Sequence, residues 1–237
     1  MHKSIHDKIA LVGTVITFLL FLKQLPIWSH FRWLDDSPWR RIGIHNDSYV
    51  ITILGFLRGF LISLILLALL LISLLLTPWV AWGGLINFNL LVNAFALGFG
   101  VAFAEELIFR GWLFEELSLL FGIRMSLLIQ AIIFSILHSK LNIDFLPSLF
   151  LLFGLFLLGL VLGQLRVKAE GSLWVPIGLH SGLVSGWFLI ESGLLSISSD
   201  APIWILGPGS PASSNPIGGA FGISFLCLIL VFQRDRI

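Results

Sequence analysis

Two adjacent carboxylates and a guanidinium stand in the middle of a strongly apolar stretch of this chain. Glu105, Glu106 and Arg110 belong to the segment FAEELIFRGWLF. An ionised side chain at the centre of a bilayer costs roughly 2.5 to 3.5 kcal/mol on insertion scales, so three that faced lipid would cost on the order of 8 to 10 kcal/mol. We therefore expect all three to face the protein interior, where ionisable groups indicate a functional site.

The spacing of these groups predicts different roles for the two glutamates. Glu106 and Arg110 are four residues apart, so they can pair on one face of a helix. Glu105 is rotated by about 100° from Glu106 and stays free to take a proton. A buried ion pair that only holds a bundle together is the alternative. It needs one glutamate and one arginine, so the second glutamate favours a site.

Two histidines follow in later apolar segments. His138 ends the segment FSILH, and His180 lies beside the small residues Gly178, Gly182 and Ser185. Either histidine alone is typical of an interfacial, capping or hydrogen-bonded side chain. A glutamate and two histidines from separate helices, however, form a minimal set for activating water. The carboxylate is the base, and the imidazoles bind water, a metal or a developing oxyanion.

The sequence excludes a zincin-type site on one helix and speaks against two other kinds of hydrolytic site. It has no His-Glu-x-x-His segment for a zinc site on one helix and no Gly-x-Ser-x-Gly nucleophile turn. Asp144, at the edge of a span, is the aspartate nearest to the apolar interior, so an aspartyl dyad is not expected. The single cysteine, Cys227, forms no disulfide within one chain and is expected to be a small packing residue.

The composition predicts an integral membrane protein. Hydrophobic residues make up 57% of the 237 residues and charged residues 11%, whereas a soluble domain has roughly 25% charged residues. The net charge of +1, with basic residues dispersed at span ends, gives no patch for nucleic acid. The fold class is therefore all-α, a polytopic membrane helical bundle of about seven transmembrane helices. The expected spans are about residues 9–28, 49–82, 88–120, 125–138, 145–165, 173–190 and 217–232.

Some of these segments have further expected roles. Residues 30–48 carry charges between tryptophans and are expected at the membrane interface. Residues 145–165 are almost wholly Leu, Phe and Gly and are expected to be a lipid-facing scaffold, while residues 192–216 are expected to be a loop. The small residues around Ser181 to Gly186 suit close helix packing.

About eight lysines and arginines on one side of the membrane, against three on the other, predict a cytoplasmic C-terminus.

The order and spacing of these residues resemble the CPBP family of intramembrane proteases, which includes CAAX prenyl protease 2 and the bacteriocin-processing (Abi) proteins. The resemblance rests on Glu-Glu-x-x-x-Arg from Glu105 to Arg110, on Phe-x-x-x-His from Phe134 to His138, and on the later His180. It covers about residues 88–190, so the chain divides into N-terminal spans with an interfacial segment (1–87), a catalytic core (88–190) and a loop with the C-terminal span (191–237).

The resemblance implies a cavity, open at one membrane face, in which water hydrolyses a peptide bond. It implies that Glu105 is the general base, that His138 orients the water or binds a metal, and that His180 stabilises the oxyanion. Glu106 and Arg110 would hold the site together. Glu105, His138 and His180 could ligate zinc with an open position, or the same residues could act without a metal. The expected partners are the lipid bilayer and a membrane-embedded or lipidated protein or peptide substrate, in a plasma membrane or a thylakoid-type membrane.

One position departs from the family pattern. Val184 stands where the family usually has Asn or Asp, four residues after the last histidine, so an oxyanion donor or metal ligand is missing. Ser181 or Ser185 are candidate replacements. The loss of one oxyanion donor can cost about 10² to 10³ in rate. A non-proteolytic membrane scaffold or bacteriocin-immunity-type protein is therefore the alternative function. A channel is disfavoured because the sequence has no internal repeats.

Overall fold

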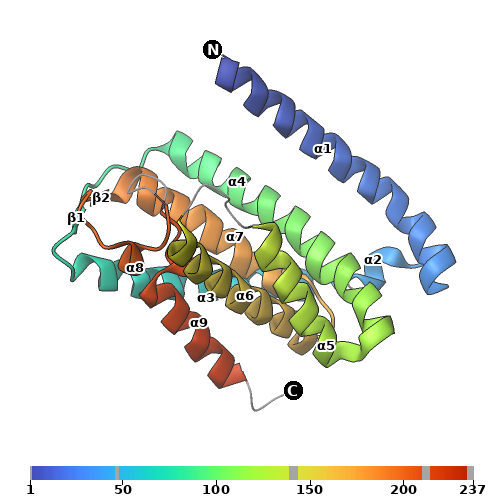
Figure 1. The fold of residues 1–237 in the computed structure, drawn as a ribbon. Coiled ribbons are helices and arrows are strands. Elements are labelled where there is room, and N and C mark those ends of the chain that lie inside the picture. Colours follow the sequence, from blue (N-terminus) through green and yellow to red (C-terminus); the bar gives the residue numbers. More distant parts are fainter. Residues whose placement is uncertain (1, 46–47, 139–143, 210–213, 234–237) are drawn as a thin grey trace.

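Long apolar helices dominate the chain (Figure 1). The computed structural model describes residues 2–45, 48–138, 144–209 and 214–233. By length and composition, four of the described helical segments could cross a membrane: Val12–Trp33, Tyr49–Leu75, Phe88–Leu137 and Phe145–Lys168. A shorter apolar helix covers Ala220–Phe232. The protein is thus an all-α integral membrane bundle, as expected, while the count of seven spans stays a prediction.

The N-terminal part consists of one helix that lies apart from the bundle along most of its length (Figure 1). The helix α1 (His2–Trp28) continues into a π-helical turn, η1 (Ser29–Trp33), and the short helix α2 (Pro38–Arg41) follows. The helix α3 (Tyr49–Leu75) belongs to the bundle. The prediction of one helix through Trp82 is wrong at its end. Pro78 disfavours helical geometry at Thr77, so the chain turns there.

Residues beyond that turn form a small sheet. Strand β1 (Val80–Trp82) pairs antiparallel with strand β2 (Leu195–Ile197), with Ala81 opposite Ser196. The segment 192–216 is therefore not only a loop, because it also contains the helix α8 (Ile203–Leu206). Pairing with β1 satisfies backbone N–H and C=O groups of this segment.

The helix α4 (Phe88–Glu106) begins at Asn87, whose side chain accepts a hydrogen bond from the Leu90 backbone over 2.8 Å. It continues through the π-helix η2 (Leu107–Leu113) into α5 (Phe114–Leu137). Gly122 interrupts α5 with φ of 74° and ψ of 166°, which a residue with a side chain rarely adopts. The chain reverses there, between the third and fourth expected spans.

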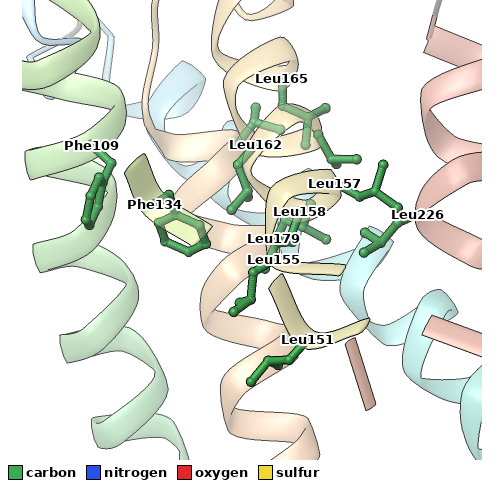
Figure 2. Packing of buried hydrophobic residues seen from close by; sticks show 12 residues of the cluster. Phe109, Phe134, Leu151, Leu155, Leu157, Leu158, Leu162, Leu165, Leu179 and Leu226 are labelled. Atoms are coloured by element: carbon green, nitrogen blue, oxygen red, sulfur yellow. The ribbon is translucent and has the colours of Figure 1, made fainter. Parts of the chain in front are cut away.

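The remaining helices are α6 (Phe145–Lys168) and α7 (Trp174–Leu189), then a π-helical turn η3 (Ile190–Leu194), the 3₁₀ turn η4 (Pro216–Gly218) and α9 (Ala220–Gln233). The expectation that α6 is a lipid-facing scaffold is wrong, because it has the largest buried share of the four long apolar segments. Its leucines form the core with Phe109, Phe134 and Leu226 (Figure 2). An all-apolar sequence does not distinguish contact with lipid from contact with neighbouring helices.

The helix α7 packs between α3 and α4 through its small residues. A Cβ at Gly178 would overlap the carbonyl oxygen of Phe56 in α3, and a Cβ at Gly182 would overlap Ser63. On α4, a Cβ at Gly98 would overlap the hydroxyl of Ser185. The expected close packing of small residues is confirmed, and it brings His180 against the end of α4.

Candidate active site

Glu105 and Glu106 are the last two residues of α4, and Arg110 lies in the π-helix that follows. Nη1 of Arg110 donates a hydrogen bond to Oε1 of Glu106 over 2.9 Å, and both side chains are completely buried. The predicted ion pair between them is confirmed. Because a buried guanidinium is always charged, Glu106 beside it is an ionised acceptor.

His180 of α7 binds the same carboxylate oxygen. Its Nδ1 lies 2.8 Å from Oε1 of Glu106. Since an ionised carboxylate only accepts hydrogen bonds, the imidazole must carry a proton on Nδ1. The opposite nitrogen, Nε2, therefore faces Glu105, whose Oε2 is 3.8 Å away. Glu106 thus fixes both the tautomer and the direction of the His180 ring.

His138 approaches Glu105 from the end of α5. Its Nδ1 donates to the carbonyl oxygen of Phe134 over 2.7 Å, because that oxygen can only accept. Its Nε2 lies 3.3 Å from Oε1 of Glu105. A hydrogen bond between these two atoms requires one further proton, carried either by the imidazole or by the carboxyl group. Glu105 and His138 therefore hold one exchangeable proton between them.

The Nε2 atoms of His138 and His180 thus face different oxygens of the Glu105 carboxylate. The Glu105 side chain is 24% exposed, whereas that of Glu106 is 0% exposed. Of the two adjacent glutamates, Glu105 is therefore the one that a substrate or water can reach. The division of roles that the sequence suggested has a geometric basis, although the catalytic roles themselves stay predictions.

Glu105, His138 and His180 line one part of a cavity of about 370 Å³. Leucines from α3, α4, α6 and α7 form much of the remaining wall, with Phe134, Trp187, Phe188 and Phe225. A cavity of this size and apolar lining, with few polar groups, is typical of a ligand site. The arrangement can hold an apolar chain with a polar bond placed against the carboxylate.

Residues 87–185 match a family model described as type II CAAX prenyl endopeptidase Rce1-like. The match shows a similarity to that family over this segment, residues 87–185, which is called the Rce1-like domain below. This finding supports the expected relationship to CPBP intramembrane proteases and, in general terms, a CAAX-type intramembrane endopeptidase. A second family model, of a domain of unknown function, matches residues 1–37. No curated protein and no solved structure matches the chain.

Phe134 lies in the Rce1-like domain, and no role was predicted for its side chain. Its ring is 1% exposed and lies 4.2 Å below the guanidinium carbon of Arg110 and 4.3 Å from the His138 ring. Phe109 packs on it edge to face (Figure 2). Phe134 thus supports Arg110 with its face and His138 with its carbonyl group. The four-residue spacing between Phe134 and His138 was the sequence signal for this contact.

Val184 lies at the cavity of the Rce1-like domain, one helical turn after His180. The suggestion that Ser181 or Ser185 replaces the missing polar residue is not supported, because neither serine lines the cavity. Both are buried, and Ser185 packs on Gly98 of α4. Each serine follows a cavity-lining residue, His180 or Val184, by one position on α7. Its side chain is therefore rotated by about 100° away from the cavity wall. The wall beside His180 is therefore apolar.

Glu115 and Glu116, in the first turn of α5, lie outside the cavity. Glu115 accepts hydrogen bonds from Arg166 over 2.7 Å and from Arg41 over 3.1 Å. Glu116 accepts one from Trp28 over 2.7 Å. These carboxylates connect the N-terminal helices and α6 to the first turn of α5. Their role is structural, at the end of the bundle where the basic residues gather.

Within the described ranges, no group of three His, Cys, Asp or Glu side chains is placed to hold a metal ion. Glu106, the most buried carboxylate of the site, is already bound by Arg110 and His180. The present arrangement of Glu105, His138 and His180 thus gives no fit for zinc, so the mechanism below includes no step through a metal. The zinc expectation stays a prediction for metal analysis to test.

Proposed function

We propose that the chain is an intramembrane endopeptidase that hydrolyses a peptide bond of a membrane-associated, prenylated-type protein substrate. The observation that carries this proposal is the placement of Glu105 between two imidazole nitrogens at the wall of an apolar cavity. The Rce1-like domain supports the same reaction class. Water is the proposed nucleophile, because no serine, threonine or cysteine side chain among the described residues is a hydrogen-bond partner of Glu105, His138 or His180.

In this mechanism Glu105 is the general base. It takes a proton from a water molecule as the water oxygen attacks the carbonyl carbon of the scissile bond. The carbon–nitrogen bond of the resulting tetrahedral intermediate then breaks. Glu105 returns the proton to the leaving nitrogen, so the products are a carboxyl group and an amine. A single carboxylate can perform both transfers because the water and the leaving nitrogen use the same oxygen in turn.

His180 stabilises the oxyanion in its imidazolium form. Its Nδ1 proton belongs to the hydrogen bond with Glu106, so only a second proton on Nε2 can reach a substrate oxygen. The Glu106 carboxylate balances the charge of that imidazolium in the mechanism. His138 is a positioning residue for Glu105, since its Nε2 lies 3.3 Å from Oε1. Arg110 donates to Glu106 and compensates its charge.

The apolar cavity supports a class of substrate. A long apolar pocket beside the site receives the hydrocarbon or apolar side chains of a membrane-embedded or lipidated peptide. A water-soluble, highly charged substrate would have to lose its hydration to enter. The proposed location is a plasma membrane or a thylakoid-type membrane. The C-terminus is proposed to be cytoplasmic, because Arg124 and Lys168 belong to the basic residues that the sequence places on one side of the expected spans.

A second function has one observation in its favour. Val184 lines the cavity where CPBP relatives usually have an oxyanion donor. A membrane scaffold or bacteriocin-immunity-type protein would retain the ion pair and the bundle without hydrolysis. The two functions differ in their dependence on Glu105, because a scaffold needs Glu106 and Arg110 but gains nothing from the second carboxylate.

The test is a comparison of protein termini in membranes that contain wild-type protein or Glu105→Gln. We expect new termini with the wild type and a loss of at least about 10² in their rate of formation with Glu105→Gln. Glu170→Gln is the matched control, because Glu170 is an exposed glutamate in the turn after α6. Equal processing by wild type and Glu105→Gln would rule out the endopeptidase.

Metal dependence is tested separately. Metal content is measured in active, purified wild-type protein and in His138→Ala. If zinc takes part, it should be bound at one atom per chain and be lost with His138→Ala. Full activity in a preparation free of bound metal would exclude zinc as a cofactor.

A further inference from the structure

The helix α3 contains one charged residue, Arg58, which the proposed mechanism does not use. Its side chain is exposed, and no hydrogen bond, ion pair or ring contact joins it to any residue that the structure describes. It also lies outside the lining of the cavity. An arginine stays charged in a protein. The surface of α3 therefore carries a positive charge that no described residue balances.

The surface around Arg58 is apolar. Leu54, Leu57 and Leu61 lie within one helical turn of it, and each is more than half exposed. The helix α3 is also one of the four segments that are long and apolar enough to cross a membrane. These leucines therefore contact acyl chains in the bilayer. A charge on such a surface is costly unless its side chain reaches the polar interface or a group of opposite charge.

Contacts between α3 and α7 fix the depth of Arg58 in the bundle. A Cβ on the next residue, Gly59, would overlap the carbonyl oxygen of Val175, so Arg58 is level with the first turn of α7. That turn lies close to the basic segment of α2, because the Leu173 N–H donates to the carbonyl oxygen of Gly43 over 2.9 Å. A long arginine side chain near this end can extend to the headgroup layer while its stem stays among apolar groups.

We propose that Arg58 binds the phosphate group of an anionic phospholipid in the leaflet at the basic end of the bundle. The planar guanidinium donates two parallel hydrogen bonds to phosphate oxygens, a geometry that an ammonium group cannot reproduce. The exposed leucines beside Arg58 contact the acyl chains of the same lipid. The site is independent of the proposed hydrolysis, because Arg58 does not line the cavity.

A phospholipid suits this position better than an acidic side chain of a second protein. A carboxylate on another transmembrane helix at the same depth would itself face lipid before the two proteins met, which is costly. A phospholipid brings its phosphate to the headgroup layer in every membrane. Anionic headgroups also attract arginines near the membrane surface more strongly than zwitterionic ones do.

Native mass spectrometry of the full-length protein in detergent tests the site. Phosphatidylglycerol or phosphatidylcholine is titrated into the protein, and the Kd of the first bound lipid is measured. We expect Arg58→Leu to weaken the binding of phosphatidylglycerol about fivefold, as for the loss of one cation beside an anionic headgroup. It should change the binding of phosphatidylcholine less than about twofold. Arg58→Lys keeps the charge and should retain part of the affinity.

Arg124→Leu is the matched control. Arg124 is an exposed arginine two residues after Gly122, and it too has no partner among the residues that the structure describes. Its substitution should leave the Kd of the first phosphatidylglycerol unchanged. Equal weakening by Arg58→Leu and Arg124→Leu, or no weakening by Arg58→Leu, would overturn the site. A dimer in the same spectra that Arg58→Leu dissociates, without any effect on phosphatidylglycerol, would assign the charge to a second chain and also overturn it.

Discussion

His180 and Glu106 are joined by a hydrogen bond of 2.8 Å between α7 and the end of α4. The same carboxylate oxygen accepts the bond from Arg110, so two donors from different elements converge on one fully buried atom. The orientation of the imidazole that faces Glu105 thus depends on the charge of a residue that lines no part of the cavity. In the proposed mechanism, Glu106 therefore contributes both to stability and to the position of His180.

Glu106→Gln should destabilise the protein and reduce hydrolysis. It leaves the buried Arg110 charge without compensation, which costs about 3 to 5 kcal/mol. Adding Arg110→Met removes that charge and should recover most of the melting temperature in detergent. Hydrolysis should stay about 10- to 100-fold lower in the double variant, because the remaining amide oxygen accepts a weaker hydrogen bond from His180 and supplies no charge to balance its imidazolium. If the double variant regains full activity, Glu106 does not position His180.

Val184→Asn should increase the rate of hydrolysis. Asn at this position would place an amide donor at the cavity wall one turn from His180, and a single oxyanion donor is worth about 10² to 10³ in kcat. We expect a rise of at least about tenfold, with little change in KM. Val184→Leu is the control, since it keeps the wall apolar and should give no gain. An Asn variant no faster than the Leu variant would contradict the assignment of the oxyanion to this wall.

Phe134→Leu should lower both stability and activity. It keeps the backbone carbonyl that binds His138 but removes the ring beneath Arg110, a cation–π contact of about 1 to 2 kcal/mol when desolvated. Thermal unfolding and kcat are the measurements. Phe153→Leu, on the exposed side of α6, is the matched control and should change neither beyond experimental error. Equal effects of the two substitutions would show that the Phe134 ring contributes no more to stability and activity than an exposed ring does.

Gly178→Ala should separate α7 from α3. A Cβ at Gly178 would overlap the backbone of Phe56, which cannot move without the whole helix, so we expect a loss of about 1 to 3 kcal/mol. Gly100→Ala in α4 is the control, because a Cβ there meets nothing within 4 Å. It should stabilise the helix by about 0.5 to 1 kcal/mol. Melting temperatures of both variants in the same detergent decide the question.

The burial of α6 could not be predicted from its sequence. The helix α6 reads as lipid-facing because it is almost wholly apolar, yet it is the core of the bundle. In a water-soluble protein the buried face of a helix is marked by its contrast with polar residues, whereas in a membrane both faces are apolar. Only the glycines, such as Gly159 against Ala131, mark the packed side of this helix.

The candidate site was easier to predict because charge is costly in an apolar environment. Glu105, Glu106, Arg110, His138 and His180 could be singled out from the sequence alone, since few polar groups remain inside the spans. The four-residue spacing predicted the Glu106–Arg110 pair correctly. Local geometry along one helix was sufficient for that pair, because both residues belong to the same turn.

The sequence by itself determined the membrane bundle, the ion pair and the set of polar residues, because these depend on composition and on spacing within one helix. The tertiary structure decided which glutamate faces the cavity, that Phe134 supports both Arg110 and His138, and that Val184 rather than a serine lines the wall. It also left Arg58 exposed on α3, without a partner among the described residues. These relationships depend on how separate helices rotate and pack against each other, which no spacing within a single helix encodes.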